Sequence, residues 1–122
     1  MNTRKILIVE DEEVLRRFVK ISLEFEGFKV YEAADGQEGM ELVQKEMPVL
    51  VITDLMMPEM DGITFYKRMK EKKETMNIPI IVLTAKDGFQ DVLDAYDNGV
   101  VMYLTKPFDP RMLVQRVHEI LS

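Results

Sequence analysis

The sequence contains no cysteine, no tryptophan and a single histidine, His118. Without cysteine the chain has no disulfides, no thiol nucleophile and no thiolate metal site, and one histidine is too few for a histidine-rich metal centre. No apolar run approaches the roughly 18 residues that cross a bilayer, and the first residues do not resemble a signal peptide, so we expect none. We therefore expect a soluble, cytoplasmic protein whose available metal ligands are oxygen atoms. His118 lies late in an amphipathic segment, and we expect it to be solvated and without a role.

A basic excess is also absent. The chain has 22 Asp and Glu residues against 16 Lys and Arg residues, which gives a net charge of −6. Nucleic-acid binding requires an accumulated basic face, so we expect no direct nucleic-acid partner and no membrane partner. The 122 residues are enough for one domain with a real core but not for two, so we expect residues 1–122 to form a single domain.

Five short apolar runs alternate with five longer segments of helical spacing. The runs, which we expect to be strands, are residues 5–9, 29–33, 49–53, 79–83 and 101–105. The expected helices are residues 12–26, 36–46, 62–73, 88–98 and 109–121. The first, third and fourth runs are almost entirely Val, Ile and Leu, as in strands that helices cover on both faces. The alternation predicts parallel βαβ crossovers and a two-sided α/β sheet.

Polar residues stand at the carboxyl ends of four of the five predicted strands. They are Glu10 and Asp11 after the first strand, Asp54 after the third, Thr84 after the fourth and Lys106 after the fifth. The second strand offers only a turn residue, Asp35. In an open α/β sheet, ligands bind in the crevice outside the carboxyl ends of the strands. If these four strands lie side by side, their polar groups form one pocket.

The residue types in this pocket favour phosphoryl chemistry. Glu10, Asp11 and Asp54 would repel one another, and a hard divalent cation removes that conflict. Oxygen ligands, few of them from the protein, favour Mg²⁺ with several retained waters. Lys106 adds a positive charge and Thr84 a hydroxyl donor, which together can neutralise a phosphoryl group while an aspartate attacks it to give an acyl phosphate.

Each of these residues also has an ordinary structural interpretation. Asp11 can cap the first helix, Asp54 can be a turn acid at a strand end, Thr84 is a common strand residue, and Lys106 before a proline is usually a surface lysine. Only their joint placement at the ends of four strands favours a functional site.

The first helix carries more apolar surface than one core stripe requires. Leu15, Phe18, Val19 and Leu23 form one face, and Val14, Ile21 and Phe25 widen it. One interpretation is a broadly buried helix. The other is a docking face for a partner, formed by Val14, Leu15, Phe18 and Phe25.

Four motifs, in order and at suitable intervals, resemble the receiver domain of two-component response regulators, which has the CheY-like, flavodoxin-like fold. They are ILIVEDE at 6–12, DLMMPEMDG at 54–62, VLTAK at 82–86 and YLTKPF at 103–108. The resemblance covers essentially the whole chain. It implies a doubly wound (βα)5 sandwich with the strand order 2-1-3-4-5.

The resemblance also implies roles for the site residues. Asp54 would accept the phosphoryl group, and Asp11 and Asp54 would bind Mg²⁺ directly. Glu10 would act through water, and the main-chain carbonyl of Met56 would be a further ligand.

The remaining roles concern the fourth and fifth strands. Lys106 would contact the phosphoryl group, Thr84 would hydrogen-bond to it, and Tyr103 would turn inward when Thr84 moves. The peptide bond between Lys106 and Pro107 would be cis.

A protein of this family would take its phosphoryl group from a sensor histidine kinase or a phosphotransfer protein. It would then switch the face formed by the fourth helix, fifth strand and fifth helix to control a downstream protein. It is not a conventional enzyme, since it catalyses only its own phosphoryl transfer and autodephosphorylation. Because an apolar Met56 cannot orient the attacking water, we expect slow self-dephosphorylation.

Several alternatives remain open. The chain is expected to be a stand-alone regulator, but a receiver excised from a transcription regulator or hybrid kinase would have the same sequence. The apolar residues 100–102 argue against a charged dimer interface, so we expect a monomer or a weak phosphorylation-dependent dimer, unless these side chains pack into the core.

A flavodoxin-like cofactor binder would need a Gly/Ser/Thr-rich loop where EDEE stands at 10–13, and an aspartate phosphatase would need an acid at Met56. A receiver that binds partners without phosphorylation is disfavoured because every key residue is present.

Overall fold

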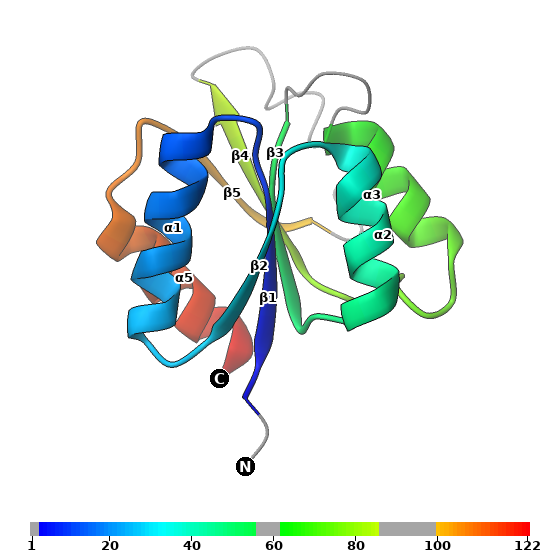
Figure 1. The fold of residues 1–122 in the computed structure, drawn as a ribbon, viewed down its shortest axis with the longest axis horizontal. Helices are drawn as coiled ribbons and strands as arrows, with labels where there is room; N and C mark the ends of the chain where they lie inside the picture. The colour runs from blue at the N-terminus through cyan, green and yellow to red at the C-terminus, as the bar shows by residue number, and fades with distance from the viewer. Residues whose placement is uncertain (1–2, 56–61, 86–99) are drawn as a thin grey trace.

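Five parallel strands in the order β2-β1-β3-β4-β5 form a central sheet (Figure 1). The computed structural model describes residues 3–55, 62–85 and 100–122. The strands are β1 (Lys5–Val9), β2 (Lys29–Ala33), β3 (Leu50–Asp54), β4 (Ile80–Ala85) and β5 (Val100–Lys106). The parallel α/β fold and its strand order are therefore as expected.

Helices cover both faces of the sheet, as Figure 1 shows. Helices α1 (Glu13–Phe25) and α5 (Pro110–Leu121) lie on one face, and α2 (Gly36–Glu46) and α3 (Gly62–Glu71) lie on the other. The expected helix at 88–98 falls outside the described residues. The bounds of the described elements agree with the sequence-based ranges to within two residues. Among the described residues, no helix is both long enough and apolar enough to cross a bilayer.

The strands form this sheet because they alternate side chains between two apolar layers. Leu7, Val9, Val51, Ile80 and Val82 pack toward α2 and α3, against residues such as Met40, Val43, Phe65 and Met69. Ile6, Ile8, Leu50, Ile52, Ile81 and Leu83 pack toward α1 and α5, against residues such as Val19, Leu23, Leu113 and Val117. Every residue of β3 is buried. Burial on both faces explains why β1, β3 and β4 consist almost entirely of Val, Ile and Leu.

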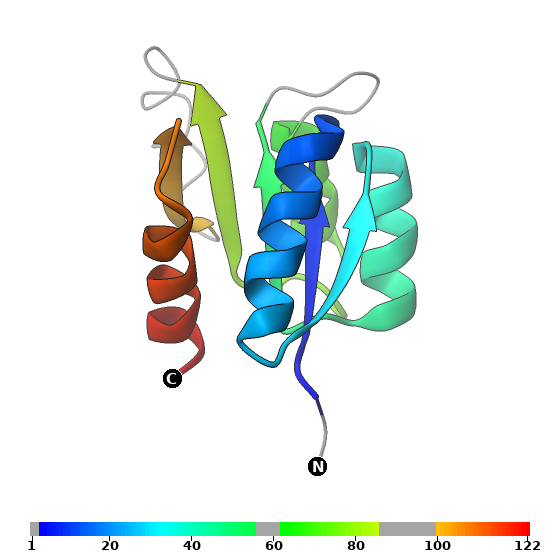
Figure 2. The same ribbon diagram turned by 60° about the vertical axis from the view of Figure 1, so that its left-hand side comes forward.

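All strands run in one direction, so their carboxyl ends lie at one edge of the sheet (Figure 2). The carboxyl end of α5 lies at the opposite edge. Register brings the last residues of neighbouring strands together, because Val9 pairs with Thr53 and Asp54 pairs with Leu83. This edge is where the polar strand-end residues were expected to meet.

Candidate functional site

Lys106 joins two of the predicted acids at the carboxyl edge of the sheet. Its ammonium Nζ lies 2.9 Å from Glu10 Oε1 and 3.2 Å from Asp54 Oδ2. Glu10 is fully buried at the end of β1, and Asp54, the last residue of β3, is almost fully buried. Burial lowers the pKa of Lys106, but the hydrogen bond to Glu10 and the charge of Asp54 outweigh it, so the pKa lies above its usual value. Lys106 is therefore a fixed cation facing two carboxylates.

Three carboxylates converge beside this lysine. Glu10, Asp11 and Asp54 each offer an oxygen atom, and these atoms all lie within 4.8 Å of one another. Burial raises the pKa of Glu10 to about 7, and the nearby charge of Asp54 adds to the increase, while the bonds from Lys106 and the Glu12 N–H oppose it. The anionic form of Glu10 is thus disfavoured without a further cation. A set of oxygen donors at this spacing fits a hard divalent cation such as Mg²⁺.

Thr84 lies in β4, the strand next to Asp54. It is buried and pairs with Thr105 of β5, one residue beyond the pairing of Asp54 with Leu83. The structure thus places it at the same sheet edge as the acids and Lys106.

The other predicted site residues fall in several places. The peptide bond between Lys106 and Pro107 is cis, in agreement with the expectation. Tyr103, in β5, is 36% exposed. Met56 lies outside the described residues. The capping alternative for Asp11 is not observed, because the N-cap of α1 is Glu12 and no side chain makes a capping hydrogen bond there.

Strand β2 contributes a charged residue that the sequence analysis missed. We expected only Asp35 there, and that residue caps α2 by accepting from the Glu38 N–H at 2.8 Å. The missed residue is Glu32, which accepts from Arg16 Nε at 3.0 Å, while Arg16 Nη1 donates to the Glu10 carbonyl at 2.8 Å. The available signal was an acid in the interior of a predicted strand, between Tyr31 and Ala33.

Helix α1 is not broadly buried, so that interpretation of its wide apolar face was wrong. Val14 and Phe25 are 79% and 88% exposed, and Ile21 is also exposed. Of the other two residues named for the docking face, Phe18 is about half exposed, whereas Leu15 is partly buried against the core. The outer surface of α1 is therefore an uncovered apolar face.

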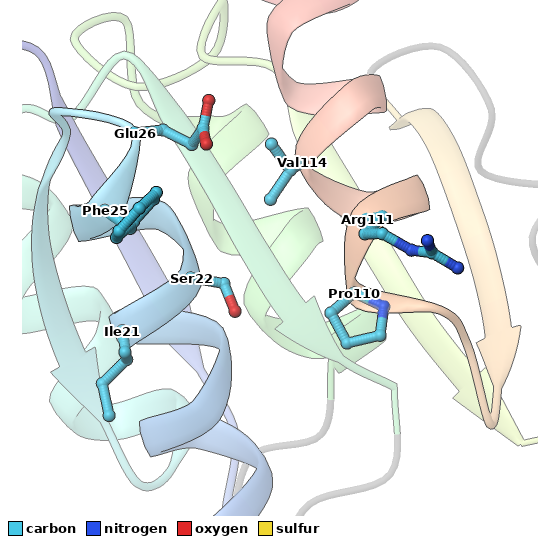
Figure 3. A pocket seen from close by; sticks show the side chains of 7 residues that line it. All are labelled: Ile21, Ser22, Phe25, Glu26, Pro110, Arg111 and Val114. Atoms are coloured by element: carbon cyan, nitrogen blue, oxygen red, sulfur yellow. The ribbon is translucent and has the colours of Figure 1, made fainter.

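Part of this face borders a groove between α1 and α5 (Figure 3). The groove has a volume of about 380 Å³. Ile21, Ser22, Phe25 and Glu26 line it from the side of α1, and Pro110, Arg111 and Val114 line it from α5.

His118 is exposed, as expected, but it makes contacts that the sequence did not reveal. Its Nε2 lies 2.9 Å from Glu26 Oε1, and its ring centroid lies 5.6 Å from that of Phe28. The sequence indicated that His118 is solvated, but it could not show that Glu26, at the end of α1, lies opposite the His118 ring. His118 therefore links the end of α5 to the end of α1.

Known proteins are similar to this chain in both sequence and fold. Residues 6–118 match the response regulator receiver domain family. The transcriptional regulatory protein SrrA of Staphylococcus aureus is 42% identical over 119 residues, which are 98% of this chain and 48% of SrrA. The chain thus spans about half the length of the curated relatives it matches.

Two solved structures extend the comparison to the fold. A putative response regulator from Chloroflexus aurantiacus has a TM-score of 0.89 at 33% identity, and 98% of each chain is covered. The chemotaxis response regulator CheY4 of Vibrio cholerae also has a TM-score of 0.89, at 29% identity, over 98% of this chain and 99% of that one. With matching sequence, fold and strand-end acids, the chain belongs to the response regulator receiver domain family of two-component systems.

Proposed function

We propose that Asp54 accepts a phosphoryl group, in a Mg²⁺-dependent reaction, from the phosphohistidine of a sensor histidine kinase or a phosphotransfer protein. This proposal is carried by one observation: Lys106 contacts both Glu10 and Asp54 at the sheet edge where three carboxylates converge. An acid with a purely structural role at a solvated strand end needs neither a lysine nor other carboxylates beside it. A nucleophile that attacks a phosphoryl group needs both a fixed position and nearby positive charge.

The chemistry of transfer follows from the positions of these groups. An Asp54 carboxylate oxygen attacks phosphorus, a P–O bond forms and the P–N bond breaks, and the electron pair returns to the imidazole nitrogen of the donor. Lys106 compensates charge on the phosphoryl oxygens, because its ammonium already lies 3.2 Å from Asp54. Thr84, on the neighbouring strand, donates its hydroxyl to the same group.

Asp11, Asp54 and the Met56 carbonyl would hold Mg²⁺, with Glu10 acting through water. Bound Mg²⁺ neutralises the charge that gathers on the phosphoryl group. Glu10 is fully buried while Asp11 is exposed, so the cation would be reached from the Asp11 side. The chain would later hydrolyse its own acyl phosphate, slowly, because Met56 offers no polar group to orient water.

The proposed switch joins the site to the output face. Thr84 would move toward the phosphoryl group and Tyr103, now partly exposed, would turn inward. Tyr103 lies on β5, within the face formed by the fourth helix, β5 and α5, and Thr84 lies on the neighbouring strand β4. The expected fourth helix (residues 88–98) is outside the described residues. The modification would bias two conformations of this face toward a downstream protein.

The exposed face of α1 is the proposed docking surface for the kinase or phosphotransfer protein. Val14, Phe18 and Phe25 are exposed, and Leu15 supports the face from its partly buried position. The face begins next to the acidic turn at Glu10 and Asp11, so a helix packed against it would bring a phosphohistidine close to Asp54.

The arrangement of the whole protein is a separate proposal. The domain would act in the cytoplasm, either as a stand-alone regulator or as the receiver of a longer transcription regulator or hybrid kinase. SrrA, about twice as long, is a transcriptional regulatory protein, which favours the longer arrangement. The domain itself, with a net charge of −6, would bind proteins rather than nucleic acid and would be a monomer or a weak phosphorylation-dependent dimer.

Intact-mass spectrometry tests the central proposal. The protein is incubated with acetyl phosphate and Mg²⁺, and one added phosphoryl group is expected. Asp54→Asn should abolish the addition, as should EDTA. Asp109→Asn is the matched control, because Asp109 is an exposed acid that caps α5 and is not one of the three converging carboxylates. Unchanged labelling of Asp54→Asn would overturn the assignment.

A further inference from the structure

Every polar group of Glu10 is bonded. Its N–H donates to the Ala33 carbonyl at 2.9 Å, its Oε2 accepts from the Glu12 N–H at 3.0 Å, and its Oε1 accepts from Lys106. The remaining group, the Glu10 carbonyl, accepts from Arg16 Nη1 at 2.8 Å. That bond is the only one of the four that an α1 side chain supplies.

Arg16 is itself held in place. Its side chain is only 13% exposed, and its Nε donates to Glu32 Oε1 at 3.0 Å. Glu32 lies in β2, opposite Ile8 in the register with β1. Burial raises the pKa of Glu32, but the bonds from Arg16 and Lys20 outweigh it and hold the pKa below its usual value. One guanidinium thus spans β2, the end of β1 and the first turn of α1.

The turn that carries the acids has little other support from α1. The helix begins after Glu12, which makes no side-chain capping bond, and Asp11 is exposed. A side-chain cap is the usual way to fix the entry of the chain into a helix. Here the bond from Arg16 to the Glu10 carbonyl fixes the entry of the chain into the helix instead. Hydrogen bonds from a charged donor are stronger than those between neutral groups.

We propose that Arg16, anchored by Glu32, is a positioning residue that holds the Glu10–Asp11 turn in the geometry that binds Mg²⁺. This inference rests on the proposed function. Arg16 is not one of the residues proposed to hold the cation or the phosphoryl group, and it would act through the main chain of Glu10. A guanidinium can donate in two directions at once, which a lysine cannot do with the same geometry.

The chain supplies matched controls. Arg17 and Lys20 also face Glu32, with contacts of 3.8 Å and 3.4 Å. Within the part of the chain that the structure describes, neither contacts Glu10. Arg17→Gln and Lys20→Gln therefore remove the same charge near Glu32 without loosening the turn.

The first test uses metal-free protein in EDTA and reads amide hydrogen exchange of Glu12, whose N–H is bonded to Glu10 Oε2. Arg16→Gln should speed this exchange several-fold relative to Arg17→Gln, while the amides of β3 stay protected. Glu32→Gln should act in the same direction with a smaller effect. This variant keeps Arg16 in place, so it provides the test if Arg16→Gln does not fold. Arg16→Lys should be intermediate.

The second test measures Mg²⁺ binding by calorimetry and phosphorylation by acetyl phosphate at varied Mg²⁺. Arg16→Gln should weaken Mg²⁺ binding by about 10-fold, as outer-shell substitutions commonly do. The Mg²⁺ concentration for half-maximal phosphorylation should rise in proportion, with the rate at saturating Mg²⁺ little changed. A merely structural loss would instead lower the phosphorylated fraction without moving that midpoint.

The two tests separate the inference from the proposed function. If wild-type protein binds no Mg²⁺ and accepts no phosphoryl group, the proposed function fails, and the amide exchange alone then decides whether Arg16 holds the turn. If wild-type protein does both, and Arg16→Gln matches Arg17→Gln in exchange and in Mg²⁺ affinity, the role of Arg16 is refuted while the function stands.

Discussion

Lys106 and Glu10 form an ion pair of 2.9 Å across the sheet, from β5 to β1, although β3 and β4 lie between those strands. The lysine is partly exposed and the acid is fully buried. Removing the lysine leaves a buried carboxylate without its cation, which is more costly than never having had the pair.

We therefore expect Lys106→Met to lower the free energy of unfolding of metal-free protein by about 2 kcal/mol at pH 8. At pH 5.5 the loss should be smaller, because Glu10 can then take up a proton. Urea unfolding followed by circular dichroism measures both values. Lys70→Met is the control, since Lys70 on α3 donates to the Met76 carbonyl and lies over the Tyr66 ring, and neither of these partners is an acid. Equal losses at the two pH values would contradict the explanation.

The second prediction concerns the pH dependence of stability. Burial raises the pKa of Glu10 from 4.5 to about 7, so between these values the folded protein holds a proton that the unfolded chain releases. Stability attributable to this group is therefore present below about pH 4.5 and is lost as the pH rises through 7. In EDTA, wild-type protein should lose on the order of 2–3 kcal/mol relative to Glu10→Gln between pH 5 and pH 8.

Urea unfolding of both proteins across this pH range provides the measurement, and Mg²⁺ at pH 8 should restore part of the lost stability of the wild type. A difference between the two proteins that does not vary with pH would show that Glu10 does not titrate in this range.

The third prediction concerns the lifetime of the acyl phosphate. Met56→Asn should shorten the half-life of phosphorylated protein, because an amide can orient the attacking water and a thioether cannot. The decay is followed by intact-mass spectrometry after removal of acetyl phosphate. Met56→Leu serves as the apolar control and should leave the half-life near that of the wild type. An unchanged or longer half-life for Met56→Asn would count against the role assigned to this residue.

The fourth prediction concerns the apolar face of α1. Phe25→Ser and Val14→Ser should slow transfer from the sensor kinase that phosphorylates the wild type fastest, while labelling by acetyl phosphate stays unchanged. Met76→Ser is the control, since Met76 is an exposed methionine beyond α3, on the other side of the sheet. Kinase transfer rates equal to those of the wild type would argue against docking on this face.

The fifth prediction concerns the end of α2. Met47 has a φ of 48°, in the left-handed region, which carries a penalty for residues with a β-carbon. Met47→Gly should therefore be more stable than Met47→Ala by about 1 kcal/mol, since glycine adopts this conformation freely. Comparing glycine with alanine removes the effect of losing the methionine side chain. Thermal or urea unfolding of the pair tests the prediction.

The sequence predicted the fold well because its strands are simple. Runs such as LVIT in β3 are buried on both faces, so their apolar composition alone reveals them. The shared direction of the strands then forces Asp54, Thr84 and Lys106 to one edge, and no contact had to be known in advance. The strand ends shifted by only one or two residues, as with Asp54, which belongs to β3 in spite of its charge.

The sequence predicted less where the outcome depends on a neighbouring element. Helical periodicity gives a face of α1, but it does not show which part of that face α5 covers, so the sequence left open whether Phe18 is buried or exposed. For the same reason, the sequence could not show that Glu26 lies opposite His118. Arg16 and Glu32 are 16 residues apart on different elements, and each resembles an ordinary surface charge when read alone.

The ion pair between Glu10 and Lys106 joins residues 96 positions apart, from the first strand of the chain and the last. A nascent polypeptide leaving the ribosome therefore exposes Glu10 and Asp54 long before their lysine has been synthesised. Until the final strand emerges, Lys106 cannot pair with either acid, so any prematurely terminated product that ends before β5 lacks both of these ion pairs.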